Sequence, residues 1–232
     1  MGRRSDLTTS CLKLWILMVL VLVVVLVGLQ LEINPFKALT KDSAVSIQTS
    51  DTDRPSKKSV EKCSGKKNCP DGQFSFYMKS GAANVVGPNI CVNNKLILGT
   101  ILNNVGTGIN IAVLDGKTGA LMKSDHFDMY SGEIEPLITF LKSIKEASVV
   151  LIATFDEPSS RLNEEARKLI ADLGSASINS LGFRDNWLFV GGKGTEMKSN
   201  FEKYIKNDRN TNAYENWPEL IELQGCIPKF LD

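Results

Sequence analysis

Histidine is almost absent from this sequence, and neither sign of charge is in excess. The 232 residues include one histidine, His126, and 27 basic against 26 acidic residues, for a net charge of +1. A nearly neutral chain lacks the basic surface that attracts a phosphate backbone, so we expect no nucleic-acid partner. Zinc sites draw on histidines and closely spaced cysteine pairs, and this chain has neither in the required pattern. We therefore expect no metal site.

The usual catalytic and cofactor motifs are also missing. Gly116-Lys-Thr118 resembles the end of a phosphate-binding loop, but Ile111 stands where the first glycine of that motif belongs. His126 has no partner in the sequence that would suit acid–base or nucleophilic chemistry. Asp156 and Glu157 are neighbours, and neighbouring side chains on a strand point in opposite directions, so they do not suit paired acids. We expect neither an enzyme nor a cofactor.

The N-terminus contains an uninterrupted apolar run over residues 14–29. It follows the basic residues Arg3, Arg4 and Lys13, which is the order found in targeting segments. Residues 1–31 are therefore predicted to be a signal peptide or an uncleaved signal-anchor, and the length of the run leaves both open. In either case the rest of the chain is exported, and residues 12–31 contact a membrane only if they are retained.

Composition divides the remainder into a linker and a folded domain. Residues 32–62 are mostly polar and have little to bury, which predicts a flexible linker, and residues 63–230 are predicted to fold. The domain holds an even set of four cysteines, which suits disulfides in an oxidising compartment. Four cysteines allow three pairings, and the sequence alone leaves all three open. The cysteines are Cys63, Cys69, Cys91 and Cys226.

Strand and helix patterns alternate within the domain. Alternating or continuous apolar runs predict strands, and apolar residues three and four positions apart predict helices. The predicted strands are 74–78, 109–114, 120–127, 148–155 and 187–190, and the predicted helices are 134–144, 162–173 and a short turn at 201–205. The resulting fold class is mixed α/β (α+β), a compact sandwich in which helices cover a mixed β-sheet.

Short motifs spread over the domain resemble one secreted family. In these motifs the chain is similar to the family of pancreatic-derived factor and the interleukin-like inducer of epithelial–mesenchymal transition, and the interleukin-like branch is the nearer of the two. The motifs are Ser80-Gly-Ala-Ala-Asn-Val-Val-Gly-Pro88, Gly108-Ile-Asn-Ile-Ala112, Phe127-Asp-Met-Tyr130, Leu173-Gly-Ser175, Leu181-Gly-Phe-Arg-Asp-Asn-Trp187, Tyr214-Glu-Asn-Trp-Pro218 and Gly225-Cys-Ile-Pro228.

The resemblance implies a GG-type lectin domain with two disulfides, for which we expect the pairs Cys63–Cys91 and Cys69–Cys226. The same module resembles the stem domain of the protein O-mannose N-acetylglucosaminyltransferase, which binds a β-linked N-acetylglucosamine.

In this chain the resemblance places the sugar site at Asp156 and Arg184. A carboxylate accepts hydrogen bonds from sugar hydroxyls, and a guanidinium donates them. Phe183 or Trp187 would supply an apolar face, although Trp187 opens an apolar strand and is expected in the core. The alternative for Asp156 and Arg184 is a salt bridge with each other and no ligand.

Two positions depart from the family pattern. Thr107 stands between two glycines where relatives carry a basic residue, and Val190 replaces an extra cysteine that supports a covalent dimer. We therefore expect no covalent dimer.

The sequence thus predicts a secreted, non-enzymatic, cytokine-like signalling protein that leaves the cell through the endoplasmic reticulum and Golgi. Its lectin module would bind a glycan or a cell-surface receptor. The alternative is a Golgi protein anchored as a type II membrane protein, whose module binds glycans as an accessory to an enzyme. A lumenal glycosyltransferase is a more remote alternative, because the chain shows no nucleotide-sugar motif.

Overall fold

The computed structural model describes residues 15, 17–23, 63, 68–194 and 198–230. The chain divides into two units, Met1–Ser56 and Lys57–Asp232. In the first unit, residues 17–23 are helical. Among the described residues, no helix is long and apolar enough to cross a membrane. Most of the predicted targeting segment 1–31, and all of the predicted linker 32–62, lies outside the described residues.

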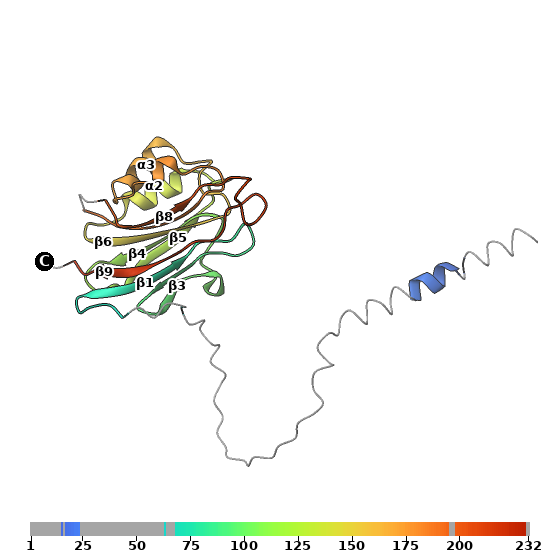
Figure 1. The fold of residues 1–232 in the computed structure, drawn as a ribbon, viewed down its shortest axis with the longest axis horizontal. Coiled ribbons are helices and arrows are strands. Elements are labelled where there is room, and N and C mark those ends of the chain that lie inside the picture. The colour runs from blue at the N-terminus through green and yellow to red at the C-terminus, as the bar shows by residue number, and fades with distance from the viewer. Residues whose placement is uncertain (1–14, 16, 24–62, 64–67, 195–197, 231–232) are drawn as a thin grey trace, which may run out of the picture. The chain divides into compact units, whose positions relative to one another are not determined.

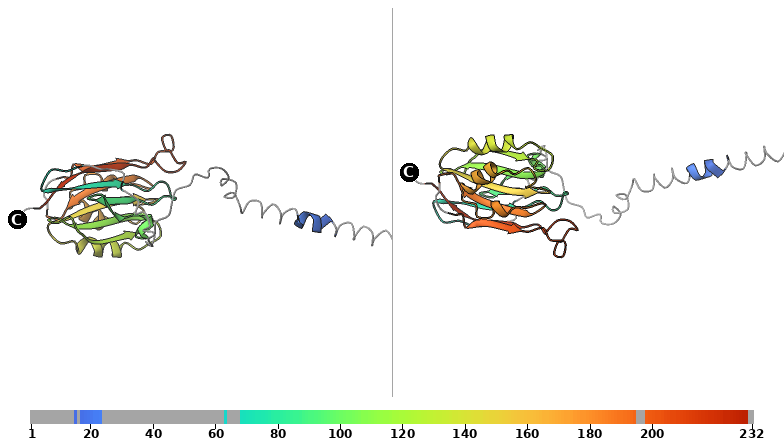
Figure 2. Two further views of the ribbon diagram at one scale, coloured as in Figure 1. Left: turned by 90° about the horizontal axis from the view of Figure 1, so that it is seen from below. Right: turned by 90° about the horizontal axis from the view of Figure 1, so that it is seen from above.

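The second unit has three layers, two β-sheets and a pair of helices (Figures 1 and 2). The five-stranded sheet has the order β5 (Leu121–Phe127), β4 (Gly108–Asp115), β6 (Ser148–Phe155), β7 (Asn186–Gly192) and β8 (Phe201–Ile205). The four-stranded sheet has the order β3 (Lys95–Leu98), β2 (Asn89–Val92), β1 (Gln73–Lys79) and β9 (Glu222–Pro228). Helices α2 (Glu135–Lys142) and α3 (Glu164–Ala171) cover the outer face of the five-stranded sheet.

This architecture confirms the mixed α/β sandwich, with one difference in strand direction. We expected a mixed sheet, and every pairing between the described strands is antiparallel. Neither helical connection produces a parallel pair: α3 joins the antiparallel neighbours β6 and β7, and α2 joins β5 to β6. Both strands are antiparallel to β4 and therefore run the same way, but β4 lies between them, so this connection produces no parallel pair.

The middle strands of the larger sheet are buried on both faces. On β6, Val150 and Ile152 face the helices, while Val149, Leu151 and Ala153 face the smaller sheet. A strand with one face in solvent alternates apolar and polar residues. A strand covered on both faces has apolar residues at successive positions instead. This confirms the prediction that the apolar run at 148–155 is a central strand.

Both predicted helices are confirmed, with bounds one or two residues inside the predicted ranges 134–144 and 162–173. Asn163 precedes α3, and its side-chain oxygen accepts a hydrogen bond of 2.9 Å from the backbone nitrogen of Ala166. Pro136 lies in the first turn of α2, where its missing N–H would have no partner within the helix. Each helix buries one apolar stripe against the larger sheet.

The prediction for residues 201–205 is wrong. They form β8, an edge strand paired with β7, rather than a helical turn. Phe201 and Ile205 pack toward the inter-sheet core, and Tyr204 packs toward the helices. The sequence pattern did not predict β2, β3 or β9.

Two disulfides fasten the smaller sheet. Cys63 is bonded to Cys91 in β2, and Cys69 is bonded to Cys226 in β9, as we expected from the family resemblance. The second bond joins residues 157 positions apart and ties the last strand to the segment before β1.

Candidate functional site

Four segments of the chain meet at one end of the sandwich, and three of them carry the candidate site residues. β6 and β7 are antiparallel neighbours, so the loop after β6 and the loop before β7 lie at the same end. The segment 206–221 joins β8 to β9 and lies at the same end. In Figure 1 this end is the one away from the C-terminus. A backbone hydrogen bond of 2.8 Å from Gly81 to Thr154 brings the loop after β1 to the same place.

Asp156 is the first residue after β6 and has a left-handed backbone conformation, with φ of 62°. Such a conformation is uncommon for a non-glycine residue and persists only where the surrounding structure holds it. The next residue, Glu157, is buried, and its carboxylate accepts hydrogen bonds from the backbone nitrogens of Ser159 (2.9 Å) and Ser160 (3.0 Å). Glu157 therefore stabilises the loop that contains it, while Asp156 lies at the end of β6, where the loops meet.

Arg184 and Phe183 lie in the turn before β7. Arg184 is also left-handed, with φ of 59°. The turn is held by buried Asp185, whose carboxylate accepts hydrogen bonds of 2.7 Å from the Gly182 nitrogen and the Tyr204 hydroxyl. Burial, followed by the Asp185 carboxylate, raises the pKa of Tyr204, so its hydroxyl stays a donor. The turn thus projects Phe183, which is 47% exposed, and Arg184 beside it.

Trp217 links the two predicted residues, and sequence reasoning had not assigned it to the site. Its indole Nε1 donates a hydrogen bond of 3.0 Å to Oδ1 of Asp156. Its ring centroid lies 4.1 Å from Cζ of Arg184, which is cation–π distance, and Cζ lies 4.8 Å from the Phe183 ring. A tryptophan within a polar loop, in the motif Tyr214-Glu-Asn-Trp-Pro218, was the signal available for finding it.

The structure brings Asp156, Phe183 and Arg184 together without a salt bridge. Among the described residues, no ion pair within 4.0 Å joins Asp156 to Arg184. The contact is indirect, because Trp217 binds the carboxylate through its ring edge and lies against the guanidinium. One carboxylate, one guanidinium and two aromatic rings can therefore offer hydrogen bonds and a stacking surface to a ligand.

The two other candidate positions on β7 lie elsewhere. Trp187 is fully buried under the helices, and its Nε1 donates a hydrogen bond of 2.8 Å to Glu202, so it belongs to the core as expected. Val190 is buried between the two sheets.

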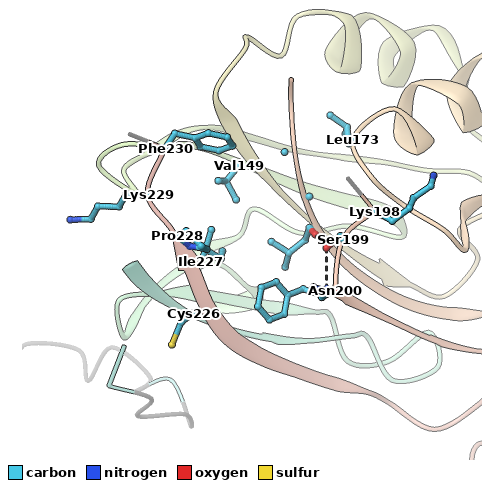
Figure 3. Close-up of a pocket in the computed structure, with 14 residues that line it drawn as sticks. Val149, Leu173, Lys198, Ser199, Asn200, Cys226, Ile227, Pro228, Lys229 and Phe230 are labelled. Carbon is cyan, nitrogen blue, oxygen red and sulfur yellow. Dashed lines mark hydrogen bonds between the residues drawn. The ribbon is translucent and has the colours of Figure 1, made fainter. Parts of the chain in front are cut away.

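A cavity of about 490 Å³ opens at the opposite end of the sandwich and contains none of these site residues. Its walls are mostly apolar and include Val149, Ile227 and Phe230. Figure 3 shows that the amines of Lys198 and Lys229 at its rim point away from each other. The group of carboxylate, guanidinium and aromatic side chains that the family resemblance points to lies at the other end of the molecule, so we place the candidate site there. Within the described ranges, no cluster of His, Cys, Asp or Glu could hold a metal ion.

Comparison with known proteins supplies the family. The family model described as "Interleukin-like EMT inducer" matches residues 107–195. The chain is 57% identical to Protein FAM3C of Danio rerio over 167 residues, which are 72% of this chain and 74% of that protein. It is 53% identical to Protein FAM3C of Homo sapiens over 171 residues, which are 74% of this chain and 75% of that protein.

Protein FAM3D of Homo sapiens is 49% identical over 167 residues, which are 72% of this chain and 75% of that protein. The family expected from the sequence motifs is thereby confirmed. The chain belongs to the FAM3 family, whose domain is that of the interleukin-like EMT inducer.

Proposed function

We propose that this chain is a secreted, cytokine-like protein without enzymatic activity, and that its domain binds a glycan or a glycosylated receptor. The binding site is the group formed by Asp156, Phe183, Arg184 and Trp217. The observation that carries the proposal is the stack of the Arg184 guanidinium on the Trp217 ring, with Trp217 held by Asp156.

The chemistry of these four side chains supports binding. Aromatic rings pack against the apolar faces of sugar rings, while carboxylates and guanidinium groups form hydrogen bonds with hydroxyls. Asp156 and Arg184 both hold left-handed backbone conformations, which cost free energy and are often found at binding sites. The groups that meet here are suited to holding a ligand rather than to attacking one.

A glycan array tests this proposal. The wild-type protein should bind a defined set of glycans, and Arg184→Ala should lose that binding while keeping the wild-type melting temperature. Lys95→Ala is the matched control, because Lys95 is an exposed positive charge at the start of β3, at the opposite end. Blank arrays for the wild-type protein, or equal binding by wild type and Arg184→Ala, would remove the sugar site from the proposal.

Secretion needs its own measurement, because the alternative is a Golgi-anchored accessory protein that binds glycans. The apolar run at 14–29, part of which is helical, is compatible with a cleaved signal peptide and with a retained membrane anchor. Mass spectrometry of the medium and membranes of expressing cells distinguishes them. We expect a soluble form in the medium whose N-terminus lies between residues 30 and 62. Recovery in membranes alone, with residues 12–31 intact, would favour the anchored form.

A further inference from the structure

The Nε atom of Arg184 is the one buried side-chain nitrogen or oxygen in the described part of the chain that has no hydrogen-bond partner. Its guanidinium forms no ion pair with a described residue either. Buried polar groups in proteins are nearly always satisfied, so an exception calls for a physical reason. Nε is covered by the protein, so a ligand would meet the terminal nitrogens Nη1 and Nη2, which form no hydrogen bond with a described residue and are not buried.

Arg167 shows how this fold treats a guanidinium that serves structure. Its Nη1 donates to the carbonyl of Ile178, and its Nη2 donates to the carbonyl of Leu181 at 3.0 Å. The fork of Arg167 is therefore occupied by the backbone of the segment next to α3. Arg184 is half-buried as well, but the described chain supplies no such acceptors, and its contacts are the rings of Phe183 and Trp217.

Stacking against aromatic rings covers the flat faces of a guanidinium and leaves its edge of N–H donors for another group. A partly desolvated positive charge without a counter-ion is best matched by an anion. The fork of two parallel N–H bonds fits a carboxylate in particular. Asp156 does not serve this purpose, because it forms no ion pair with Arg184 and its Oδ1 accepts the hydrogen bond from Trp217.

Asp156 restricts the ligand in a second way. Its Oδ2 accepts no hydrogen bond from any described residue. Its negative charge would repel a bare anion that came to Arg184. A ligand that suits both residues must therefore carry a donor group for Asp156 beside the anionic group for Arg184. Acidic sugars combine a carboxylate and hydroxyl groups on one ring.

We infer that the site selects acidic sugars, such as uronic or sialic acids, whose carboxylate binds the fork of Arg184 and whose hydroxyl donates to Asp156. This inference rests on the proposed function and narrows it from glycans in general to carboxylated glycans. Phe183 and Trp217 flank the guanidinium and would pack against the sugar ring.

Two simple sugars test the inference on the wild-type protein. Methyl β-D-glucuronide and methyl β-D-glucoside have the same ring hydroxyls and differ at carbon 6, where one has a carboxylate and the other a hydroxymethyl group. Binding to the secreted protein can be measured by calorimetry and by the change in tryptophan fluorescence. We expect about tenfold tighter binding of the glucuronide, because hydrogen bonds to charged groups are roughly twice as strong as neutral ones. The preference should weaken as salt is added.

Variants then assign the preference to a residue. Arg184→Gln should bind the two sugars equally, Arg184→Lys should keep part of the preference, and Lys95→Ala should keep all of it. Methyl N-acetyl-β-D-glucosaminide serves as the neutral sugar expected to bind if the general glycan proposal holds.

The outcomes separate the two proposals. Equal or tighter binding of the neutral sugars would overturn the selection of acidic sugars and leave the glycan site standing. No binding of any sugar, together with a blank glycan array, would remove both. Because the sugar comparison uses the wild-type protein, it decides the question even if an Arg184 variant fails to fold.

Discussion

The indole Nε1 of Trp217 donates a hydrogen bond of 3.0 Å to Oδ1 of Asp156, 61 positions away in the sequence. The bond joins the segment between β8 and β9 to the end of the central strand β6. It also sets the ring of Trp217 against the guanidinium of Arg184, 4.1 Å from its Cζ. One side chain thus connects all three loops of the candidate site, and its replacement should affect stability and binding together.

The variant Trp217→Phe distinguishes the contribution of the hydrogen bond from the contribution of the aromatic ring. The variant keeps an aromatic face for Arg184 but leaves Asp156 without its donor, so we expect a loss of about 1.5 kcal/mol in the free energy of unfolding. Trp217→Ala also removes the packing of the ring and should cost about 3 kcal/mol. Urea denaturation measures both values. Tyr130→Ala is the control, because that ring is 64% exposed, and it should stay within about 0.5 kcal/mol of wild type. Equal stabilities for the two Trp217 variants would show that its ring contributes nothing.

The stability of the domain should fall at alkaline pH because of Tyr77. Burial, followed by the Glu222 carboxylate, raises the pKa of Tyr77 from 10.0 to about 12. The folded chain therefore favours the neutral phenol. Its contribution to stability is complete below pH 10 and is lost as the pH rises through about 12, since the unfolded phenol ionises first.

We expect the free energy of unfolding to fall by about 1 kcal/mol more between pH 9 and 11 in wild type than in Tyr77→Phe. Urea denaturation at the two pH values measures this difference. Tyr204→Phe should remove a further part of the alkaline loss, because burial and Asp185 raise the pKa of Tyr204 as well. Parallel pH profiles for wild type and Tyr77→Phe would contradict the assignment.

Most of the larger sheet and its helices could be predicted from the sequence. Their buried residues form continuous apolar runs in the strands and apolar residues at helical spacing in the helices. The strands at 109–114, 120–127, 148–155 and 187–190 and both helices were confirmed. Strand β8 was missed because Phe201, Tyr204 and Ile205 have the spacing of a helical face. Glu202 obscures the alternating pattern of a strand, because this charged residue is directed toward Trp187 and accepts a hydrogen bond from it.

The smaller sheet was harder to predict because two of its strands are short and a third contains residues that weaken a strand pattern. β2 and β3 have four residues each and are joined by Asn93 and Asn94, whose φ values of 48° and 61° form a tight turn. An Asn-Asn pair between apolar runs was a usable signal for that hairpin. β9 contains Gly225 and ends at Pro228, residues that weaken a strand pattern but are tolerated at a sheet edge.

The sugar site that the family resemblance places at Asp156 and Arg184 stays a prediction, and the tertiary contact that joins these residues could not be predicted from the sequence. Asp156 and Arg184 were named from motifs, and the structure brings both to Trp217. No local pattern says that a tryptophan 61 positions after Asp156 will reach its carboxylate. Such a link depends on how the 206–221 segment crosses from one sheet to the other.

The two disulfides should contribute unequally to stability. Cys69–Cys226 closes a segment of 157 positions and Cys63–Cys91 one of 28. In the chain-entropy description, the longer closure restricts the unfolded chain more, by about 5 against about 3.5 kcal/mol. Replacing Cys69 and Cys226 by alanine should therefore destabilise the domain by about 1.5 kcal/mol more than replacing Cys63 and Cys91. Urea denaturation of the two double variants gives the comparison, and a reversed order would show that lost packing outweighs chain entropy.

Glu202 organises the contact between β8 and the helical layer. Its carboxylate accepts hydrogen bonds of 2.8 Å from Nε1 of Trp187 and from the backbone nitrogen of Ala176, and it also accepts from Ser175 and Ser177. An amide has one acceptor oxygen where the carboxylate has two, so Glu202→Gln should cost about 2 kcal/mol. We also expect a shift of the Trp187 emission. The control is Glu165→Gln, at a half-exposed ion pair with Lys142, which should cost no more than about 1 kcal/mol.

Gly108 opens β4 at the site end, and two properties make it irreplaceable. Its φ of 91° is unfavourable for any other residue, and a Cβ placed there would lie 2.0 Å from the carbonyl oxygen of Phe127. Gly72 has a similar φ of 79° but has open space where its Cβ would be. Gly72→Ala should therefore cost about 1 kcal/mol from the backbone alone.

Gly108→Ala should cost that amount and also force β4 and β5 apart, for a total above about 3 kcal/mol. Thermal and urea denaturation of the two variants separate backbone strain from the steric clash. If both variants lost the same stability, the close approach of Phe127 to Gly108 would have no energetic consequence, and the position would need glycine only for its backbone conformation.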